Sequence, residues 1–377
     1  MNEQRLVKNM KENKGRRFKV SIKLTLRNSI LLVLCLQNAG FTLLRRYSQG
    51  VLKERYDYSS LLLVGEFFKL ATSAYMTAFG PGQRDDTDIK HMAGVAKLRY
   101  LAINAKKMVM LAGIYGAMNL FSFISLARIS AVEFTVASQL KILVTAVFFV
   151  ILFQRKISAT RWRALVLLVC GVILVSNPDR GAGSSSTGGE RSRFGVFVGY
   201  AAVLIQVCMS GFAAVYFEKV IKSSTERLSI WDRNFQLAGC SIIFYFATYL
   251  FQQVAGTKDE GAAPGGGGFF AGWSVITLVL SMLSAGGGIL VALTFKHADS
   301  ILKTLAVSLA MVATTFFSWM LLGAELNITM LIGAVCAMLG VVNYNWDTTP
   351  PEPLKPVEEV AKETVALLDT PKEEDRT

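Results

Sequence analysis

The sequence predicts an all-α membrane protein of ten transmembrane helices, built as two inverted five-helix repeats with both termini cytosolic. The first observation is composition: 52% of the 377 residues are hydrophobic and only 18% are charged, which is more apolar than a soluble domain. The second is a series of apolar runs near the length of about 20 residues that crosses a bilayer. The third is the concentration of Lys and Arg at the N-terminus and in alternate loops, as expected for loops that stay in the cytosol.

Ten apolar runs are long enough to be spans. They occupy residues 28–45, 58–79, 108–127, 132–153, 160–177, 194–217, 231–252, 270–294, 302–322 and 327–346. The first run follows a basic segment that is too long for a signal-peptide n-region and has no small-residue cleavage site, so we expect a retained span. The predicted organisation is a basic cytosolic tail (1–27), a first five-helix repeat (28–177), a flexible lumenal linker (178–193), a second five-helix repeat (194–346) and an acidic, disordered cytosolic tail (347–377).

The net charge of +13 is interpreted as a topology signal. The basic residues gather in short loops and not on one amphipathic face, so the expected partner is the lipid bilayer and not a nucleic acid. The loops on the opposite side are expected to be poorer in basic residues, and Arg128 is alone between the third and fourth spans. The five cysteines lie in apolar runs without a C-x-x-C spacing, so neither a disulfide framework, a metal site nor a cofactor is indicated.

A weak internal repeat relates the two halves of the chain. A shift of 169 residues pairs Thr135 with Thr304 and Thr145 with Thr314, and a shift of 166 residues pairs the fifth run with the tenth. Units that begin five helices apart face opposite sides of the membrane. This is the inverted-topology architecture of many alternating-access transporters, whose substrate site lies near the bilayer midplane.

Three charged residues lie in the interior of predicted spans, away from their ends. Lys141 interrupts the run "SQLKILVTAVFFVILF", where an ammonium near the bilayer centre costs roughly 2.5 to 3.5 kcal/mol on insertion scales. Within a span of 132–153 it lies more than about 13 Å from either surface, too far for its stem to reach the interface. We expect it to face a cavity for an anionic substrate, with a structural ion pair as the alternative. Glu66 and Lys69 form an i, i+3 pair that neutralises itself, which favours a structural or gating role.

Other polar side chains are expected at a similar depth. Tyr115 and Asn119 are spaced i and i+4 and therefore share a face of the third span. A ring and an amide suit a base or a ribose, with interhelical hydrogen bonding as the alternative. Asn234 enters the seventh span one turn after Trp231. Lys303 begins the ninth span, a position at which a lysine is as often interfacial as functional.

Small residues accompany some of these candidates. Ser210 and Gly211 precede Tyr216 by one to two turns in the sixth span, an arrangement that suits a substrate contact and core packing equally. Gly287 is the middle residue of three glycines in the eighth span. A helix backbone can approach a neighbour or a ligand closely at such a point.

Six segments of the chain resemble the signatures of Golgi nucleotide-sugar transporters, in the branch that contains the CMP-sialic acid, UDP-galactose and UDP-N-acetylglucosamine carriers. The segments are "YDYSSLLLVGEFFKL", "SQLKILVTAVFFV", "RWRALVLLVCGVILV", "SGFAAVYFEKVIKSS", "IWDRNFQL" and "HADSILKTLAVSLAM". The similarity covers about residues 22 to 346 and excludes both tails. It implies ten helices of the drug/metabolite transporter superfamily, and exchange of a cytosolic nucleotide sugar for a lumenal nucleoside monophosphate.

The resemblance also implies roles for individual residues. On the matching motifs, two positions correspond to phosphate-contacting lysines, two to nucleotide-contacting residues and three to pocket positions of the second half. These are, in that order, Lys141 and Lys303, Tyr115 and Asn119, and Ser210, Tyr216 and Asn234.

The predicted protein is a nucleotide-sugar antiporter and not an enzyme, with a UDP-sugar such as UDP-galactose or UDP-N-acetylglucosamine favoured as substrate. A CMP-sialic acid/CMP exchanger is the alternative within the family, because the family motif Y-A-D-N-I-L-K-G is altered here at His297, Ser300 and Thr304. A polytopic membrane glycosyltransferase would need grouped carboxylates or histidines, and no such motif occurs. The resemblance implies the Golgi membrane, with the endoplasmic reticulum as an alternative, and leaves open whether the protein forms a homodimer.

The predicted topology places the sequon Asn327-Ile328-Thr329 in the lumen, at the first residue of the tenth span. We expect it to remain unglycosylated, because its asparagine lies too near the membrane for the glycosylating enzyme. The measurement is the mass of the protein from a eukaryotic host before and after endoglycosidase treatment. A shift in mass would contradict the prediction and would move the start of the tenth span further along the chain.

Overall fold

The computed structural model describes residues 25–80, 94–126, 128–176, 193–223, 228–255, 268–323 and 326–347. The expected tails and the 178–193 linker lie almost wholly outside these ranges. The regular secondary structure of the described residues is helical, and these residues contain no β-strand. The first helix, Thr25–Val51, ends in a π-helical turn, Tyr47–Val51.

The remaining helices follow in chain order. They are α2 (Tyr58–Phe79), α3 (Gly94–Ile103), α4 (Lys106–Leu126), α5 (Ala131–Ser138), α6 (Lys141–Phe153), α7 (Ala159–Ser176), α8 (Arg193–Ile221), α9 (Ile230–Ala255), α10 (Val275–His297), α11 (Ser300–Leu322) and α12 (Ile328–Trp346).

Eight helices of the described chain are long and apolar enough to cross a membrane, with α5 and α6 together supplying one of them. The chain is therefore a multi-pass membrane protein. The two other long helices, α2 and α9, have 22 and 26 residues but fall below that apolarity. They carry charged side chains, among them the Glu66–Lys69 pair on α2 and Asp232 on α9. The expectation of ten spans consequently depends on these two helices.

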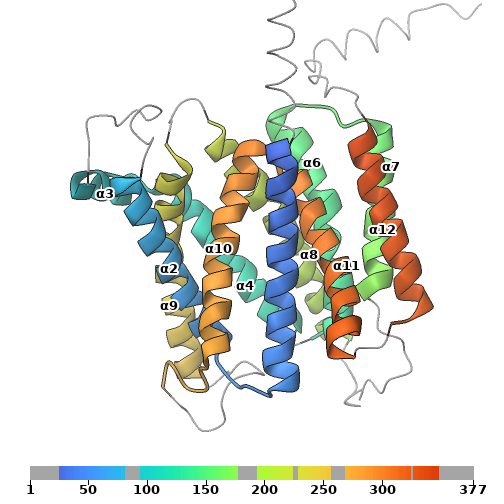
Figure 1. The fold of residues 1–377 in the computed structure, drawn as a ribbon, viewed down its shortest axis with the longest axis horizontal. Coiled ribbons are helices and arrows are strands. Elements are labelled where there is room, and N and C mark those ends of the chain that lie inside the picture. Colours follow the sequence, from blue (N-terminus) through green and yellow to red (C-terminus); the bar gives the residue numbers. More distant parts are fainter. Residues whose placement is uncertain are drawn as a thin grey trace, which may run out of the picture.

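The long helices stand side by side in one bundle, and the first helix lies near its middle (Figure 1). The chain enters the first helix and leaves α12 at the same end of the bundle (Figure 1). The main helix pairs are α7 with α12, α2 with α9 and α10, α4 with α8 and α9, and α6 with α8. Helices that are distant in sequence therefore form most of the packing.

Two apolar clusters hold the bundle together. One lies between α6, α7, α11 and α12 and includes Ile142, Leu165, Leu168, Ile301 and Leu305. The other lies between α4, α8, α9 and α10 and includes Met108, Leu111, Phe217, Leu237 and Phe295. An apolar side chain in a membrane gains no hydrophobic free energy by facing another helix instead of lipid. These clusters therefore stabilise the bundle mainly through close packing.

Glycines let α7 and α12 approach at backbone distance. A methyl group placed on Gly333 would lie 2.7 Å from the carbonyl oxygen of Gly171 and 2.8 Å from the amide of Val175. A methyl group placed on Gly340 would lie 2.9 Å from the carbonyl oxygen of Ala164. Such close approach of transmembrane helices depends on small residues, so any side chain at these positions must push the helices apart.

The predicted fourth span, 132–153, is confirmed as a candidate membrane span at Glu133–Phe153, and a turn at Gln139 and Leu140 divides it into α5 and α6. At the break, the amides of Gln139 and Leu140 bond three residues back to Val136 and Ala137, each at 3.1 Å. This tightened turn leaves the carbonyl of Thr135 without its usual amide partner. The side-chain amide of Gln139 donates to that carbonyl at 3.1 Å, which satisfies the requirement that backbone groups at membrane depth be bonded internally.

One short helix was not predicted, and one predicted boundary was wrong. The loop between the second and third spans contains the short helix α3, because buried polar contacts to α9 hold it in place, as described below. The eighth span begins at Val275 and not at 270, because residues 269–272 form a turn in which Gly272 has φ +73°. A side chain at Gly272 would overlap the carbonyl of Arg55, so the turn requires glycine.

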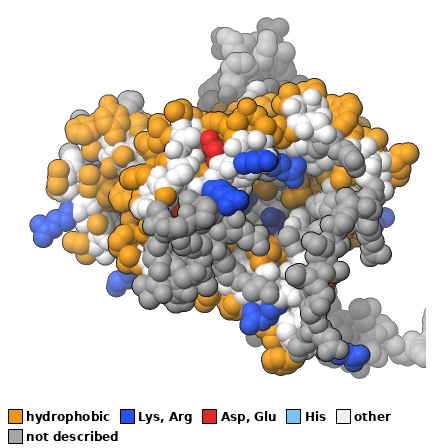
Figure 2. Space-filling model, turned by 90° about the horizontal axis from the view of Figure 1, so that it is seen from below, with side chains coloured by type: hydrophobic (Ala, Val, Ile, Leu, Met, Phe, Trp, Pro, Cys, Tyr) orange, Lys and Arg blue, Asp and Glu red, His pale blue; other side chains and the backbone are white. Residues whose placement is uncertain are grey.

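Basic side chains also occur on the face opposite the chain ends. That face carries Arg45 and Arg46 at the end of the first helix, and Lys53 and Arg55 in the following loop. Figure 2 shows basic side chains gathered near the middle of this face. Arg45 stacks 4.1 Å from the ring centre of Tyr58. Arg46 donates to the hydroxyl of Ser318 at 3.0 Å, so this arginine joins the first helix to α11.

Substituting Gly333 by alanine is expected to destabilise the protein by about 1 to 3 kcal/mol, the usual cost of overpacking a tight contact. The measurement is the thermal unfolding midpoint of purified protein in detergent. Gly286→Ala is the matched control, because it is also a helical glycine but no atom lies within 4 Å of the added methyl. That control should be neutral or slightly stabilising through helix propensity. Equal midpoints for the two variants would contradict the close α7–α12 contact.

Candidate functional site

Lys141 is the first residue of α6, directly after the break in the predicted fourth span. Its carbonyl accepts a hydrogen bond from the hydroxyl of Thr145 at 2.6 Å. The next residue, Ile142, is buried in the apolar cluster between α6, α7, α11 and α12. These contacts therefore anchor the backbone on both sides of Lys141.

Lys303 lies in the first turn of α11. Asp299 caps this helix by accepting from the amide of Leu302 at 2.7 Å, and the amide of Lys303 donates to the carbonyl of Asp299 at 3.0 Å. The ammonium groups of Lys303 and Lys141 are close enough for their charges to repel each other. The structure thus brings together two lysines that are 162 positions apart, one from each half of the chain.

Neither of these ammonium groups has an ion-pair or hydrogen-bond partner within the described residues. Three other lysines do: the Nζ atoms of Lys69, Lys97 and Lys222 lie 2.6, 2.9 and 2.6 Å from carboxylates, and Lys69 and Lys97 are buried. Lys141 and Lys303 are surrounded by the bundle, yet each keeps part of its surface accessible. Two unpaired cations in this setting can bind an anion, since pairing offsets the cost of burying charge.

A second group of site candidates lies on α4 and α9. The side chain of Asn119 lies close to the hydroxyl of Tyr245 on α9, and the carboxylate of Glu66 lies within electrostatic range of both Tyr115 and Tyr245. Tyr245 was not among the predicted residues, although "IIFYFATY" contains it, because nothing in that apolar stretch distinguishes one tyrosine from a lipid-facing ring.

The α8 candidates lie beside this group. Tyr216 and Tyr115 both pack against the apolar cluster between α4, α8, α9 and α10. The Tyr216 ring stacks on Phe212 at 5.7 Å, and Phe212 meets Phe148 of α6 edge-on at 5.6 Å. Ser210 is half-buried. These three rings form a continuous series of contacts from Tyr216 on α8 to α6, the helix that carries Lys141.

Asn234 is almost fully buried near the start of α9. Its amide nitrogen donates to the carbonyl of Ile230 at 3.1 Å, whereas its side-chain oxygen has no partner within the described residues. That oxygen therefore remains available as an acceptor. Neither Asn234 nor Ser210 hydrogen-bonds Lys141 or Lys303 in the described part of the chain, so the structure does not join them to the lysine pair.

The neighbours of Asn234 have a structural role that was not predicted. Asp232 pairs with Lys97 of α3 at 2.9 Å, with the two side chains 0% and 5% exposed. Gln236 donates to the carbonyls of Leu101 and Asn104 at 3.0 and 3.1 Å. These contacts hold α3 against α9 at the end of the bundle where the chain enters and leaves.

The four residues expected to be structural or gating make close contacts. Lys69 pairs with Glu66 at 2.6 Å, and its stem lies beside Gly288 of α10, where a methyl group would come within 3.0 Å of it. A methyl group on Gly287 would lie 2.6 Å from the amide of Gln37. On Gly211 it would lie 3.1 Å from the amide of Thr145, so Gly211 lets α8 approach α6.

Comparison with known proteins identifies the family of the chain. Residues 22–345 match the nucleotide-sugar transporter family. A UDP-N-acetylglucosamine/UDP-N-acetylgalactosamine transporter of Caenorhabditis elegans is 33% identical over 85% of this chain and 94% of its own length. The UDP-N-acetylglucosamine transporter of Rattus norvegicus is 30% identical over 84% and 94%. The UDP-galactose transporter of Schizosaccharomyces pombe is 29% identical over 86% and 88%.

One solved crystal structure shares the fold. It matches with a TM-score of 0.59 at 14% sequence identity and covers 84% of this chain and 96% of the other. At that identity the match shows the fold alone. The sequence relatives are transporters and not enzymes, and the family match spans most of the described helices. The chain therefore belongs to the nucleotide-sugar transporter family, as its motifs predicted.

Proposed function

We propose that this protein is an antiporter that exchanges a cytosolic nucleotide sugar for a lumenal nucleoside monophosphate. The observation that carries the proposal is the pair of unpaired lysines, Lys141 and Lys303, which meet from the two halves of the chain. A nucleotide sugar brings a diphosphate and a nucleoside monophosphate brings a phosphate, so both ligands supply the anion that this pair lacks. Ionised hydrogen bonds of this kind contribute roughly 1.5 to 3 kcal/mol each.

The proposed architecture is ten spans in two inverted five-helix repeats, 28–177 and 194–346, with both termini cytosolic. The helix pairs support it, because they are symmetric between the two repeats. In the proposed repeats α2 corresponds to α9, α4 to α10 and α7 to α12. The α4–α9 contact therefore corresponds to the α10–α2 contact, and the α2–α9 and α7–α12 contacts each join a helix to its own counterpart. In this arrangement α2 and α9 are spans whose polar residues face the bundle interior. The linker 178–193 would be lumenal and flexible, and the tails 1–27 and 347–377 cytosolic, the second of them disordered.

The lysine pair also supports obligate exchange. In the empty site the two ammonium groups repel each other, and closing both ends of the transporter around them would remove their remaining water. A bound phosphate offsets that cost. The loaded transporter then passes through the closed state more easily than the empty one, so uptake of one ligand requires release of another.

The nucleoside would bind beside the aromatic and amide side chains of α4, α8 and α9. Tyr115, Asn119 and Tyr216 provide rings and an amide there, while Ser210 and Asn234 provide a hydroxyl and an unused acceptor. The ring contacts through Phe212 and Phe148 connect these side chains to α6. Glu66, Lys69, Gly211 and Gly287 would hold the helices at the spacing that the site needs.

A UDP-sugar is the proposed substrate, and UDP-N-acetylglucosamine and UDP-galactose are the first to test, since relatives that transport them share about 30% identity. A CMP-sialic acid/CMP exchanger is the second candidate, because of the altered residues His297, Ser300 and Thr304. The basic face in Figure 2, opposite the chain ends, would attract the lumenal nucleoside monophosphate. The proposed location is the Golgi membrane.

Purified protein in liposomes tests the exchange. We expect labelled UDP-N-acetylglucosamine or UDP-galactose to enter only liposomes preloaded with UMP, because the empty transporter should not reorient. Preloading with CMP should support little uptake. Equal uptake into empty liposomes would indicate a channel or uniporter, release of a glycosyl product would indicate an enzyme, and preference for CMP would favour the sialic acid exchanger.

Lys141→Ala is expected to weaken UMP binding by at least about tenfold, the value of one ionised hydrogen bond, while barely affecting uridine. The empty variant should be as thermostable as the parent or more so, because an uncompensated charge is removed. The measurements are titration calorimetry and thermal unfolding of purified protein.

Lys219→Ala is the control for this variant, since Lys219 is an exposed lysine of α8 that contacts only the carbonyl of Leu152. It should change neither affinity. Equal losses for UMP and uridine in Lys141→Ala, or marked destabilisation of the empty variant, would show that Lys141 is structural and that the phosphate site lies elsewhere.

A further inference from the structure

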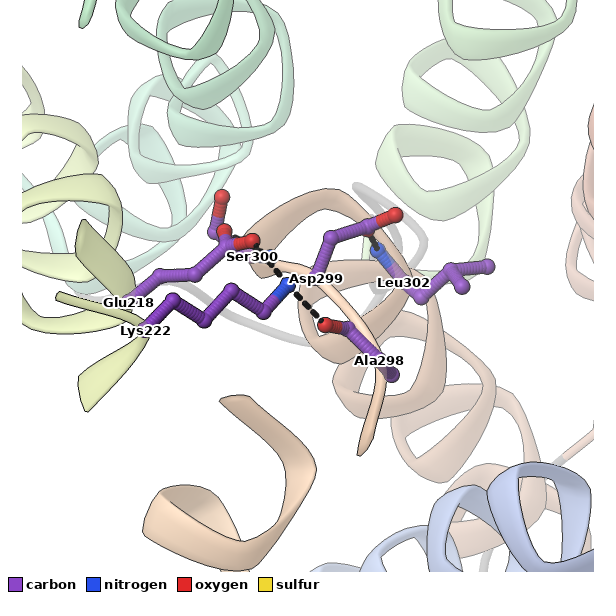
Figure 3. A network of polar contacts seen from close by, with 6 residues as sticks. All are labelled: Glu218, Lys222, Ala298, Asp299, Ser300 and Leu302. Carbon is purple, nitrogen blue, oxygen red and sulfur yellow. Dashed lines mark hydrogen bonds and ion pairs between the residues drawn. The ribbon is translucent and has the colours of Figure 1, made fainter. Parts of the chain in front are cut away.

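A carboxylate in the last turn of α8 reaches across to the start of α11. Glu218 is 1% exposed, and its Oε2 atom accepts from the backbone amide of Ser300 at 2.7 Å. Its Oε1 atom accepts from Lys222, one turn later on α8, at 2.6 Å. Figure 3 shows these groups converging on the junction between α10 and α11.

Lys222 completes the connection from the other side of the junction. Its ammonium also donates to the carbonyl of Ala298 at 2.5 Å. The carboxylate and the ammonium together bind one donor and one acceptor of the backbone that flanks Asp299, and Asp299 itself caps α11 through Leu302 (Figure 3). The first turn of α11 is therefore fixed to α8 by charged groups and not by apolar packing alone.

This turn carries Lys303. Lys303 follows Ser300 by three residues, so the amide held by Glu218 and the ammonium in the site belong to the same turn of helix. The opposite side of the site is held by α8 as well, because Gly211 brings α8 to backbone distance from Thr145, one turn after Lys141. One helix thus contacts both segments that present a lysine.

We propose that Glu218 is a positioning residue for Lys303: by holding the amide of Ser300 it sets the distance and direction at which Lys303 meets the anionic group of the ligand. This rests on the proposed function, in which Lys303 contacts a phosphate. Glu218 itself does not touch the ligand. Its loss should therefore reduce the phosphate-dependent part of binding and leave the nucleoside-dependent part unchanged.

The test is a double-mutant cycle on the full chain, with UMP and uridine as ligands in titration calorimetry. Glu218→Ala should lower UMP affinity by up to the loss seen in Lys303→Ala, on the order of tenfold, with uridine affinity unchanged. In the Lys303→Ala background the same change should add nothing. Glu218→Gln retains an oxygen for the amide of Ser300 and should recover most of the UMP affinity, and it also serves if the alanine variant does not fold.

Lys97→Met is the matched control, because it breaks a similarly buried ion pair on α3. It should lower the thermal midpoint without changing the ratio of UMP to uridine affinity. Equal losses for both ligands in Glu218→Ala, an additional loss in the Lys303→Ala background, or no recovery in Glu218→Gln would overturn the positioning role. If Lys303→Ala itself leaves the ratio unchanged, the phosphate site of the proposed function fails instead.

Discussion

The rest of the structure depends on two positive charges that lie without a counter-ion inside an apolar helix bundle. Lys141 and Lys303 lie within electrostatic range of each other without a counter-ion in the described residues, although each buried ammonium costs several kcal/mol when it has no partner. The buried lysines Lys69 and Lys97 are neutralised by nearby carboxylates. The unfavourable electrostatic energy is therefore concentrated at one place. A ligand that relieves it gains affinity from the strain of the empty state.

The packing around this place differs from one side to the other. On one side, α7 and α12 meet at glycines with backbone contacts and leave no space for rearrangement. On the other side, α4, α8 and α9 meet through aromatic rings, the contact between the Asn119 amide and the Tyr245 hydroxyl, and half-buried hydroxyl groups. Close-packed backbones resist displacement, whereas rings and polar side chains can exchange partners. The structure thus divides into a rigid support and a face that can adapt to a ligand.

Much of this arrangement was predictable from the sequence. An ammonium within an apolar run has few physical explanations, so Lys141 could be identified from its position alone, whereas Lys303 was selected through the family resemblance. What could not be predicted depends on pairing across long stretches of chain. Glu218 is 82 residues from Ser300, and Asp232 is 135 residues from Lys97. In sequence these residues resemble ordinary charges at helix ends.

Local chemistry was also harder to predict than apolar patterning. The break before Lys141 leaves the apolar pattern intact, since its turn is made by Gln139 and Leu140, neither of which is a helix breaker. The helix α3 was missed because its ten residues are too few for a span and its stability comes from buried contacts to α9. Tyr245 gave no signal because a tyrosine in an apolar run is equally suited to lipid.

The repair of the broken span by Gln139 has a consequence in lipid. A kinked helix in lipid normally needs water or a neighbouring helix to satisfy the carbonyl that the kink releases. Here the side-chain amide of Gln139 donates to the carbonyl of Thr135, so neither water nor a neighbouring helix is needed to bond that carbonyl. The interruption therefore lies directly before Lys141 without leaving that carbonyl unbonded in lipid. At the start of α5, the Ser130–Glu133 capping box bonds the first turn in a similar way.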